Sequence, residues 1–306
     1  MYRILVWSGL FLAMNLDVAH AGSPSSDGQK PVLVTGASTG IGRKITERLA
    51  AHGYVVYAGA RKDTDLQALG AIRNVHPIRL DVTRPEDIDA AVQAVTQAGR
   101  GLYGLVNNAG LYTEAPLIDT SPEEFDLLMK VNVYGPYRVT RAFASLIKAG
   151  LGRIVNIGSI SGILNETGAG AYQMSKHAME TFTATMAQEL APAGVQVSVV
   201  EPGSYKSEIV RSTATRSGTL TQKDVDDWAK LLEPDAVAAA VEMALFEPTP
   251  KRRYMVVPSE DQAEATIKAQ IEQLVQLNEG QRYTYDRAKL IKMLDVALKS
   301  ARPRVK

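Results

Sequence analysis

Short runs of consecutive apolar residues alternate with segments of helical spacing from Pro31 onward, and this alternation constrains the fold more than any other feature of the chain. It predicts seven strands, which span residues 31–35, 54–60, 76–82, 102–108, 152–158, 195–203 and 253–258. The longer helical segments span residues 41–53, 85–98, 121–148 and 171–191. Strands that are apolar throughout are typical of a parallel sheet buried on both faces. With right-handed crossovers, the pattern predicts an α/β fold, the doubly wound Rossmann sheet with helices on both faces.

Capping residues predict where several of these helices begin and end. Gly53 has the position of a C-cap for the first helix. The stretches Thr83–Glu86 and Ser121–Glu124 each combine the spacing of a capping box with a proline in the first turn. Residues 204–222 are rich in serine, threonine and glycine and lie outside the alternation, so we expect them to be mobile.

The sequence beyond the last strand predicts a helical extension to a single domain. We assign residues 31–258 to the sheet domain and residues 259–306 to the extension. Within it, residues 261–300 fit two amphipathic helices that are interrupted near Gly280. Their apolar positions include Ile267, Ile271, Leu274, Leu290, Ile291 and Leu294. We expect these positions to pack onto the edge of the domain, and a partner or a lipid surface is the alternative.

The first 21 residues have the pattern of a secretory leader. A basic residue, Arg3, precedes a short apolar run over residues 4–14, and an A-x-A site follows at residues 19–21. The run is too short to cross a bilayer comfortably as a helix. Residues 22–30 are small and polar, and we expect them to form a flexible linker.

Charge and composition exclude several classes of function. The formal net charge of +1 gives no reason to expect a nucleic acid or an anionic membrane as a partner. The chain has no cysteine, which excludes disulfides, thiol nucleophiles and cysteine metal sites. The four histidines show no spacing typical of metal ligands, so we expect no metal site.

A glycine-rich loop, TGASTGIG over residues 35–42, follows the first strand and opens the first helix. In a doubly wound sheet this position binds phosphate, because the glycines admit the ligand close to the backbone and the helix N-terminus offers free N–H groups. The loop is not a Walker A motif, since Ile41 and Gly42 stand where that motif requires glycine and lysine. The sequence therefore predicts a dinucleotide site.

The end of the second strand favours NADP(H) over NAD(H). A protein that binds the unphosphorylated ribose places a carboxylate there to accept from the 2′-hydroxyl. Here Ala60 stands at that position and Arg61 follows it. A guanidinium is a permanently charged, forked donor that suits a 2′-phosphate. A solvated loop arginine is the alternative reading of Arg61.

Four motifs now occur in order: TGASTGIG, NNAG at residues 107–110, Ser159 followed by Tyr172-x-x-x-Lys176, and Pro202-Gly203 after the sixth strand. Over about residues 31–258 this set resembles the classical short-chain dehydrogenase/reductase family, and within it the hydroxysteroid and retinol dehydrogenase types. The resemblance implies an NADP-binding domain and an enzyme that interconverts a carbonyl and an alcohol. The substrate that it implies is apolar, such as a steroid-, retinoid- or lipid-like ketone or alcohol.

The resemblance also implies roles for individual residues. Tyr172 matches the general acid/base, Lys176 the residue that binds the nicotinamide ribose, and Ser159 the residue that holds the substrate oxygen. Asn132 matches the asparagine that completes a proton relay through water. Together with the glycine loop and Arg61, the expected cofactor contacts are Gly36, Ser38, Thr39, Gly40, Ile41, Gly42, Arg61, Asp81, Val82, Asn108, Ala109, Gly110, Tyr172, Lys176, Pro202 and Gly203. Ser207 departs mildly from the family, which often has threonine there.

Tyr172 and Lys176 lie four residues apart and so share one helix face. To act as a base near pH 7, the pKa of the tyrosine has to fall from about 10 to about 7, which corresponds to about 4 kcal/mol. One ammonium at about 4 Å supplies about 4 kcal/mol at an effective dielectric constant of about 20. We therefore expect the lysine to lower the pKa of Tyr172. A non-catalytic regulator that binds the dinucleotide is the alternative function, because a fold alone does not fix an activity.

Assembly and location follow from the same patterns. The helices at residues 121–149 and 171–191 carry apolar residues around much of their circumference, which predicts a homodimer or homotetramer. The apolar positions are Phe125, Leu128, Phe143, Met179, Phe182 and Met186. The leader points to export, whereas NADP(H) is an intracellular metabolite. We favour an intracellular protein, translated from Met14 or contacting a membrane through residues 4–14, and an exported or periplasmic protein is the alternative.

Overall fold

The computed structural model describes residues 30–218 and 220–301 of the chain. The strands are β1 (Val32–Val34), β2 (Val56–Ala60), β3 (Val75–Arg79), β4 (Gly104–Asn107), β5 (Arg153–Ile157), β6 (Gln196–Pro202) and β7 (Arg253–Val256). The helices are α1 (Gly40–Ala51), α2 (Asp63–Gly70), α3 (Pro85–Gln97), α4 (Pro122–Met129), α5 (Gly135–Ala149), α6 (Gly170–Glu189), α7 (Glu208–Ser217), α8 (Gln222–Lys230), α9 (Asp235–Phe246), α10 (Glu260–Asn278) and α11 (Arg287–Ala301). The leader predicted over residues 1–21 lies outside the described residues.

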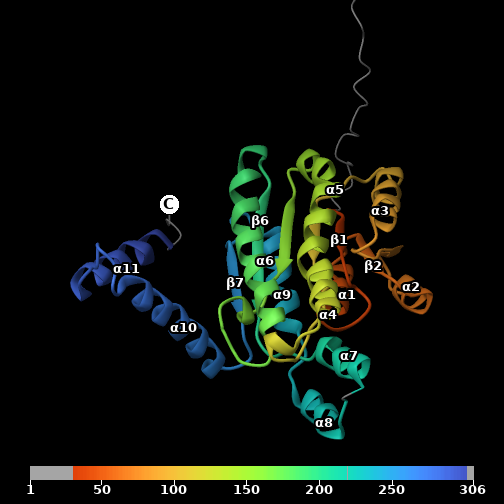
Figure 1. The fold of residues 1–306 in the computed structure, drawn as a ribbon. Coiled ribbons are helices and arrows are strands. Elements are labelled where there is room, and N and C mark those ends of the chain that lie inside the picture. The colour runs from red at the N-terminus through yellow and green to blue at the C-terminus, as the bar shows by residue number, and fades with distance from the viewer. Residues whose placement is uncertain (1–29, 219, 302–306) are drawn as a thin grey trace, which may run out of the picture.

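All seven strands form one parallel sheet in the order β3-β2-β1-β4-β5-β6-β7 (Figure 1). The predicted doubly wound sheet is therefore confirmed. The order reverses between β1 and β4, where consecutive crossovers leave in opposite directions. In sheets of this kind a ligand binds in the crevice outside the carboxyl ends of the strands at that point.

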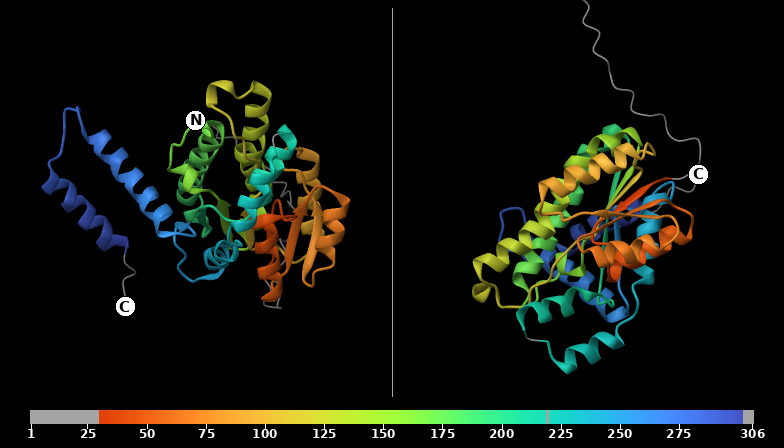
Figure 2. Two further views of the ribbon diagram at one scale, coloured as in Figure 1. Left: turned by 90° about the horizontal axis from the view of Figure 1, so that it is seen from below. Right: turned by 90° about the vertical axis from the view of Figure 1, so that its right-hand side faces the viewer.

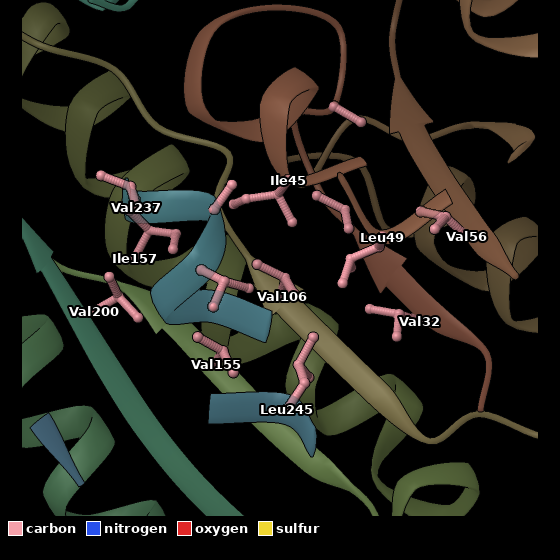
Figure 3. Packing of buried hydrophobic residues seen from close by; sticks show 14 of the residues in the cluster. Val32, Ile45, Leu49, Val56, Val106, Val155, Ile157, Val200, Val237 and Leu245 are labelled. Carbon is pink, nitrogen blue, oxygen red and sulfur yellow. The ribbon is translucent and has the colours of Figure 1, made fainter. Parts of the chain in front are cut away.

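Two hydrophobic clusters cover the two faces of the sheet. On one face α1, α2 and α9 pack on the strands, and Ile45, Leu49 and Leu245 are fully buried among the valines of β1, β2, β4 and β5 (Figure 3). On the other face α3, α5 and α6 pack around Phe143 and Ile147. Burial on both faces explains why the strand sequences are apolar without alternation.

Several helix boundaries differ from the sequence-based prediction. Ser121 caps α4 by accepting from the backbone N–H of Glu124, as expected. Thr83 does not cap α3, because its N–H and its hydroxyl both donate to Asp81 Oδ1 at 2.9 and 2.7 Å, and Arg84 takes the N-cap position. Gly53 follows the α1 cap His52 with a φ of 87°, which is the left-handed conformation expected just past a helix end.

Other differences concern whole elements. The single helix predicted over residues 121–148 is α4 and α5 joined by a π-helical turn, Lys130–Tyr134. Helices α2 and α9 were not predicted. The segment 204–222, expected to be mobile, contains α7 and the beginning of α8, which has a capping box between Thr221 and Asp224. Leu128, Phe143 and Met179, proposed as surplus apolar surface for assembly, are buried within this chain.

The C-terminal helices extend away from the sheet domain instead of packing along its edge (Figures 1 and 2). The first turns of α10 lie against the domain, with Thr266 buried, and farther along Gln273 Nε2 donates to Ile163 O at 3.2 Å. Farther along, Ile267, Ile271 and Leu274 are each more than half exposed, so the expected packing is wrong for these positions. Within residues 30–218 and 220–301, no helix combines the length and apolarity needed to cross a membrane.

Candidate active site

A cleft of about 820 Å³ opens at the carboxyl edge of the sheet, at the reversal between β1 and β4. Its volume is within the range of cofactor sites. The predicted site residues that line it are Gly36, Ser38, Thr39, Gly40, Ile41, Gly42, Arg61, Asp81, Val82, Asn108, Ala109, Gly110, Ser159, Tyr172, Lys176, Pro202 and Gly203. Segments that are far apart in the sequence are thus gathered at one site, and Asn132 is the one predicted residue that does not line the cleft.

The glycine loop is held tightly against the loop after β4. Asn108 Nδ2 donates to the carbonyls of Thr35 and Gly36, both at 3.0 Å. A Cβ added to Gly42 would lie 2.2 Å from Gly36 O and 2.3 Å from Asn108 Nδ2. No other residue fits at position 42 without a shift of the backbone.

The first turn of α1 lines the cleft. Its N-cap, Thr39, makes no side-chain capping bond, and no acidic residue stands in the first turn. The backbone N–H groups therefore point at the cleft with the positive end of the helix dipole. This arrangement fits a phosphate group of a dinucleotide.

Arg61 lies at the far end of the cleft, directly after β2. Ala60 is buried, and it leaves no carboxylate at the position that would accept from a ribose hydroxyl. The Arg61 side chain is 63% exposed, and its Nη1 lies 3.8 Å from Asp81 Oδ2. The guanidinium is therefore held near the end of β3 by a weak ion pair and remains accessible to a phosphate.

Tyr172, Lys176 and Ser159 meet at the opposite end of the cleft. The ammonium of Lys176 donates to the carbonyl of Ile157 at 2.9 Å and lies 5.6 Å from the centroid of the Tyr172 ring. Ser159 Oγ accepts from the N–H of Ser161 at 3.1 Å, which fixes the serine side chain at the end of β5. One face of α6 and the loop after β5 thus bring the three side chains together.

The pKa of Tyr172 moves in the direction opposite to the one expected from the sequence. Burial raises the pKa of Tyr172 to about 12, although a hydrogen bond with Ser159 acts in the lowering direction. Burial also lowers the pKa of Lys176 to about 8. The ammonium is bound to a backbone carbonyl rather than to the phenol, so desolvation dominates for the tyrosine. The phenol is consequently protonated at neutral pH.

Asn132 is buried in the π-helical turn between α4 and α5. Its Oδ1 accepts from Leu111 N at 2.8 Å, and its Nδ2 donates to Leu111 O at 2.9 Å and to Ser175 Oγ at 3.0 Å. Ser175 in turn donates to the carbonyl of Tyr172 at 2.7 Å. The side chain therefore fixes the helical turn that carries Tyr172, and π-helical turns are frequent at functional sites.

Several residues of the cleft were not found from the sequence. The ring of Tyr112 stacks edge-on against Tyr172 with centroids 4.9 Å apart. Gln262 reaches in from α10, and its Oε1 accepts from the N–H of Ser204 at 3.0 Å. Tyr112 stands two residues after the NNAG motif, which could have suggested it, but no local signal points to Gln262.

Of three apolar side chains near the cleft, Leu164 lines it, whereas Ile163 and Trp228 do not. Ile163 is buried beside the cleft, whereas Leu164 lines it. Trp228 is held between Lys206 and Arg211, each 4.5 Å from its ring, and donates to Ser207 O at 2.9 Å. The indole therefore ties α8 to the start of α7 rather than facing a substrate.

A doubly wound parallel sheet with a glycine loop, an uncapped helix N-terminus and a deep cleft at the strand reversal defines an α/β dinucleotide-binding protein. The profile of the short chain dehydrogenase family matches residues 30–217. The chain belongs to this family, whose members are oxidoreductases that use nicotinamide cofactors.

Relatives and a solved structure agree with this assignment. The uncharacterised oxidoreductase YbbO of Escherichia coli is 33% identical over 234 residues, which cover 74% of this chain and 86% of that protein. Retinol dehydrogenase 5 of Mus musculus is 34% identical over 244 residues, covering 77% of this chain and 71% of that protein. A short chain dehydrogenase from Burkholderia cenocepacia in complex with NADP superposes with a TM-score of 0.66 at 26% identity, covering 83% of this chain and 98% of that one.

Proposed function

We propose that the protein is an NADP(H)-dependent oxidoreductase that interconverts a carbonyl and an alcohol, with Tyr172 as the general acid/base. The observation that carries the proposal is the joint presence of Tyr172, Ser159 and Lys176 in one cleft with the phosphate-binding glycine loop. This complete set argues against a regulator that only binds the dinucleotide.

In the proposed reaction the side chains of the cleft bind and orient the substrate and the cofactor, and one of them supplies a proton. A bound nicotinamide nucleotide supplies or accepts the hydride. Ser159 Oγ holds the substrate oxygen, and Tyr172 donates its proton to that oxygen during reduction. The raised pKa of Tyr172, about 12, suits this role because the phenol carries its proton at neutral pH. Lys176 binds the ribose of the cofactor and places a positive charge beside the phenol.

The substrate that fits best is an apolar ketone or alcohol. Beyond Tyr172 and Ser159 the cleft is lined by Leu164, Ile209 and Leu231, from three different segments. Apolar side chains with a few fixed polar groups are typical of small-molecule sites. A retinol dehydrogenase among the relatives supports the same class of substrate.

Oxidation of NADPH in the presence of a panel of ketones and aldehydes tests the proposed function. We expect turnover of apolar ketones, read as a loss of absorbance of the reduced cofactor. Tight binding of NADPH without turnover of any carbonyl would instead support a regulator.

Arg61 is expected to set the choice of cofactor. Replacing Arg61 with alanine removes the guanidinium that would pair with the 2′-phosphate, so we expect the affinity for NADPH to fall about 10- to 100-fold, the range for loss of a charge-assisted hydrogen-bonded pair. The affinity for NADH, which has no such phosphate, should change little. Titration of both cofactors by fluorescence measures this, and Lys62→Ala, one residue farther along, is the matched control. Equal losses for NADPH and NADH would contradict the assignment.

The efficiency of carbonyl reduction, kcat/KM, is expected to fall at alkaline pH. Because burial lowers the pKa of Lys176 to about 8, the ammonium is present below that pH and is lost as the pH rises through it. Tyr172, with a pKa of about 12, keeps its proton throughout. We therefore expect kcat/KM for carbonyl reduction, which reports the free enzyme, to fall above about pH 8. A profile that stays level to pH 10 would contradict this role of Lys176.

A further inference from the structure

A cluster of charged side chains lies behind Lys176, on the side away from the cleft. Glu180 follows Lys176 by one turn of α6, so that both project from the same helix face. Arg253 of β7 approaches Glu180 Oε2 with its Nη2 at 2.9 Å and also pairs with Glu201 of β6. Glu201 is only 2% exposed and Glu180 only 15%.

The glycines of the loop after β5 make room for the Glu180 carboxylate. A Cβ added to Gly158 would lie 3.0 Å from Glu180 Oε1, and one added to Gly162 would lie 3.2 Å from it. Lys176 donates to the carbonyl of Ile157, the residue just before Gly158. The ammonium and the carboxylate therefore adjoin the same peptide unit, directly beneath the loop that carries Ser159.

Only one oxygen of the Glu180 carboxylate forms an ion pair. Its Oε2 pairs with Arg253, while its Oε1 is buried and meets no N–H or O–H donor among the residues that the structure describes; the carboxyl group of Glu201 is its other polar neighbour. Arg253 is shared between two carboxylates, Glu180 and Glu201, so one negative charge in the cluster is not balanced by the guanidinium. Besides Arg253, the cation whose charge acts on Glu180 is Lys176.

We propose that Glu180 is a positioning residue that keeps Lys176 protonated, with Arg253 and the glycines at positions 158 and 162 holding its carboxylate in place. This inference rests on the proposed role of Lys176 in catalysis. A buried lysine beside a carboxylate retains its proton to higher pH than a buried lysine alone. The enzyme thereby keeps a charged lysine in a desolvated site, which its burial would otherwise oppose.

The charges of the cluster are present in the pH range where they are needed. Burial, reinforced by the Glu201 carboxylate, raises the pKa of Glu180 to about 7, so Glu180 is ionised above that pH. Lys176, with a pKa of about 8, loses its proton at higher pH. Glu180 is therefore negatively charged in the pH range where Lys176 loses its proton, and this charge acts to raise the pKa of Lys176.

The test compares the pH profiles of Glu180→Gln, Glu180→Asp and wild type. In Glu180→Gln we expect the alkaline decline of kcat/KM to begin about one pH unit lower, a loss of about ten-fold above pH 8, with little change near pH 6. Glu180→Asp keeps the charge and should restore the wild-type midpoint. Glu189→Gln, at the exposed end of the same helix, is the matched control. An unchanged midpoint in Glu180→Gln would overturn the proposal.

A second measurement does not depend on turnover. The rate at which a trace acylating reagent labels Lys176, followed by peptide mass spectrometry across pH, reports the fraction of the free amine. We expect the midpoint of labelling to move down by about one pH unit in Glu180→Gln. If no carbonyl is reduced, the proposed function fails, yet this midpoint still decides the role of Glu180: equal midpoints in the variant and the wild type would overturn it.

Discussion

Replacing Tyr172 with phenylalanine is expected to lower kcat for carbonyl reduction by about 10²- to 10⁴-fold, the contribution typical of general acid catalysis. The change removes only the hydroxyl, and the ring keeps its edge-on contact with Tyr112 at 4.9 Å. The glycine loop and Arg61 lie at the other parts of the cleft and are untouched. The affinity for NADPH should therefore stay within a few-fold of the wild-type value.

The matched control for this experiment is Tyr112→Phe. Tyr112 also lines the cleft and also has a pKa raised by burial, but it follows β4 instead of standing on α6 one turn before Lys176. We expect its variant to keep most of the wild-type kcat. Single-turnover kinetics with bound NADPH separate the chemical step from binding. If Tyr172→Phe retained most of the rate, or if both variants lost the same factor, the proton would have to come from another group.

The sequence was sufficient to predict the sheet and the residues that gather at its carboxyl edge. Continuous apolar strands are visible locally, and the doubly wound topology follows from general rules of chain connection. Most of the motif residues needed only that topology to meet, because they follow a strand closely or lie in the first two turns of a helix. The positions of Arg61 after β2 and of Ser159 after β5 illustrate this.

What the sequence did not predict depends on contacts between distant segments. The pKa of Tyr172 was expected to fall because only Lys176, its neighbour on the helix, is visible in the sequence. Burial by the loops after β4 and β6 could not be weighed, and it dominates. Gln262 reaches the cleft from α10, a helix expected to lie on the domain edge, so its contact with Ser204 has no local signature.

Two helix starts were predicted wrongly although the sequence contained the relevant residues, because neighbouring residues indicated a different structure. The Thr221–Asp224 capping box was present in the sequence, but the surrounding serines, threonines and glycines suggested a mobile segment instead of α8. At Thr83 the opposite occurred. The threonine matched a helix cap, yet Asp81, two residues earlier, offered a carboxylate that accepts both of its donors. Local competition of this kind is common for threonine and aspartate.

Among the predicted substitutions, Gly42→Ala is expected to have the largest effect on stability. Whether it raises or lowers the free energy of unfolding depends on two opposing effects, helix propensity and the clash of the added Cβ. Within a helix, alanine is favoured over glycine by about 1 kcal/mol. Against this, the added Cβ would lie 2.2 Å from Gly36 O and 2.3 Å from Asn108 Nδ2. Gly36 O belongs to the backbone, and Asn108 is already bonded to it and to Thr35 O. Neither can move without breaking the loop that joins β1 to α1.

Overpacking therefore outweighs propensity at this position, and we expect a net loss of about 2–3 kcal/mol. For a chain of this size that lowers Tm by about 3–5 °C. The affinity for NADPH should also fall, because the displaced backbone is the one that would contact phosphate.

Gly70→Ala is the control: position 70 ends α2, and its added Cβ would meet Pro77 Cγ at an ordinary 3.4 Å. We expect that variant to be as stable as wild type or slightly more stable. A rise in Tm for Gly42→Ala would mean that the glycine loop and the loop after β4 yield easily. The tight fit at Gly42 would then not be what shapes the phosphate site.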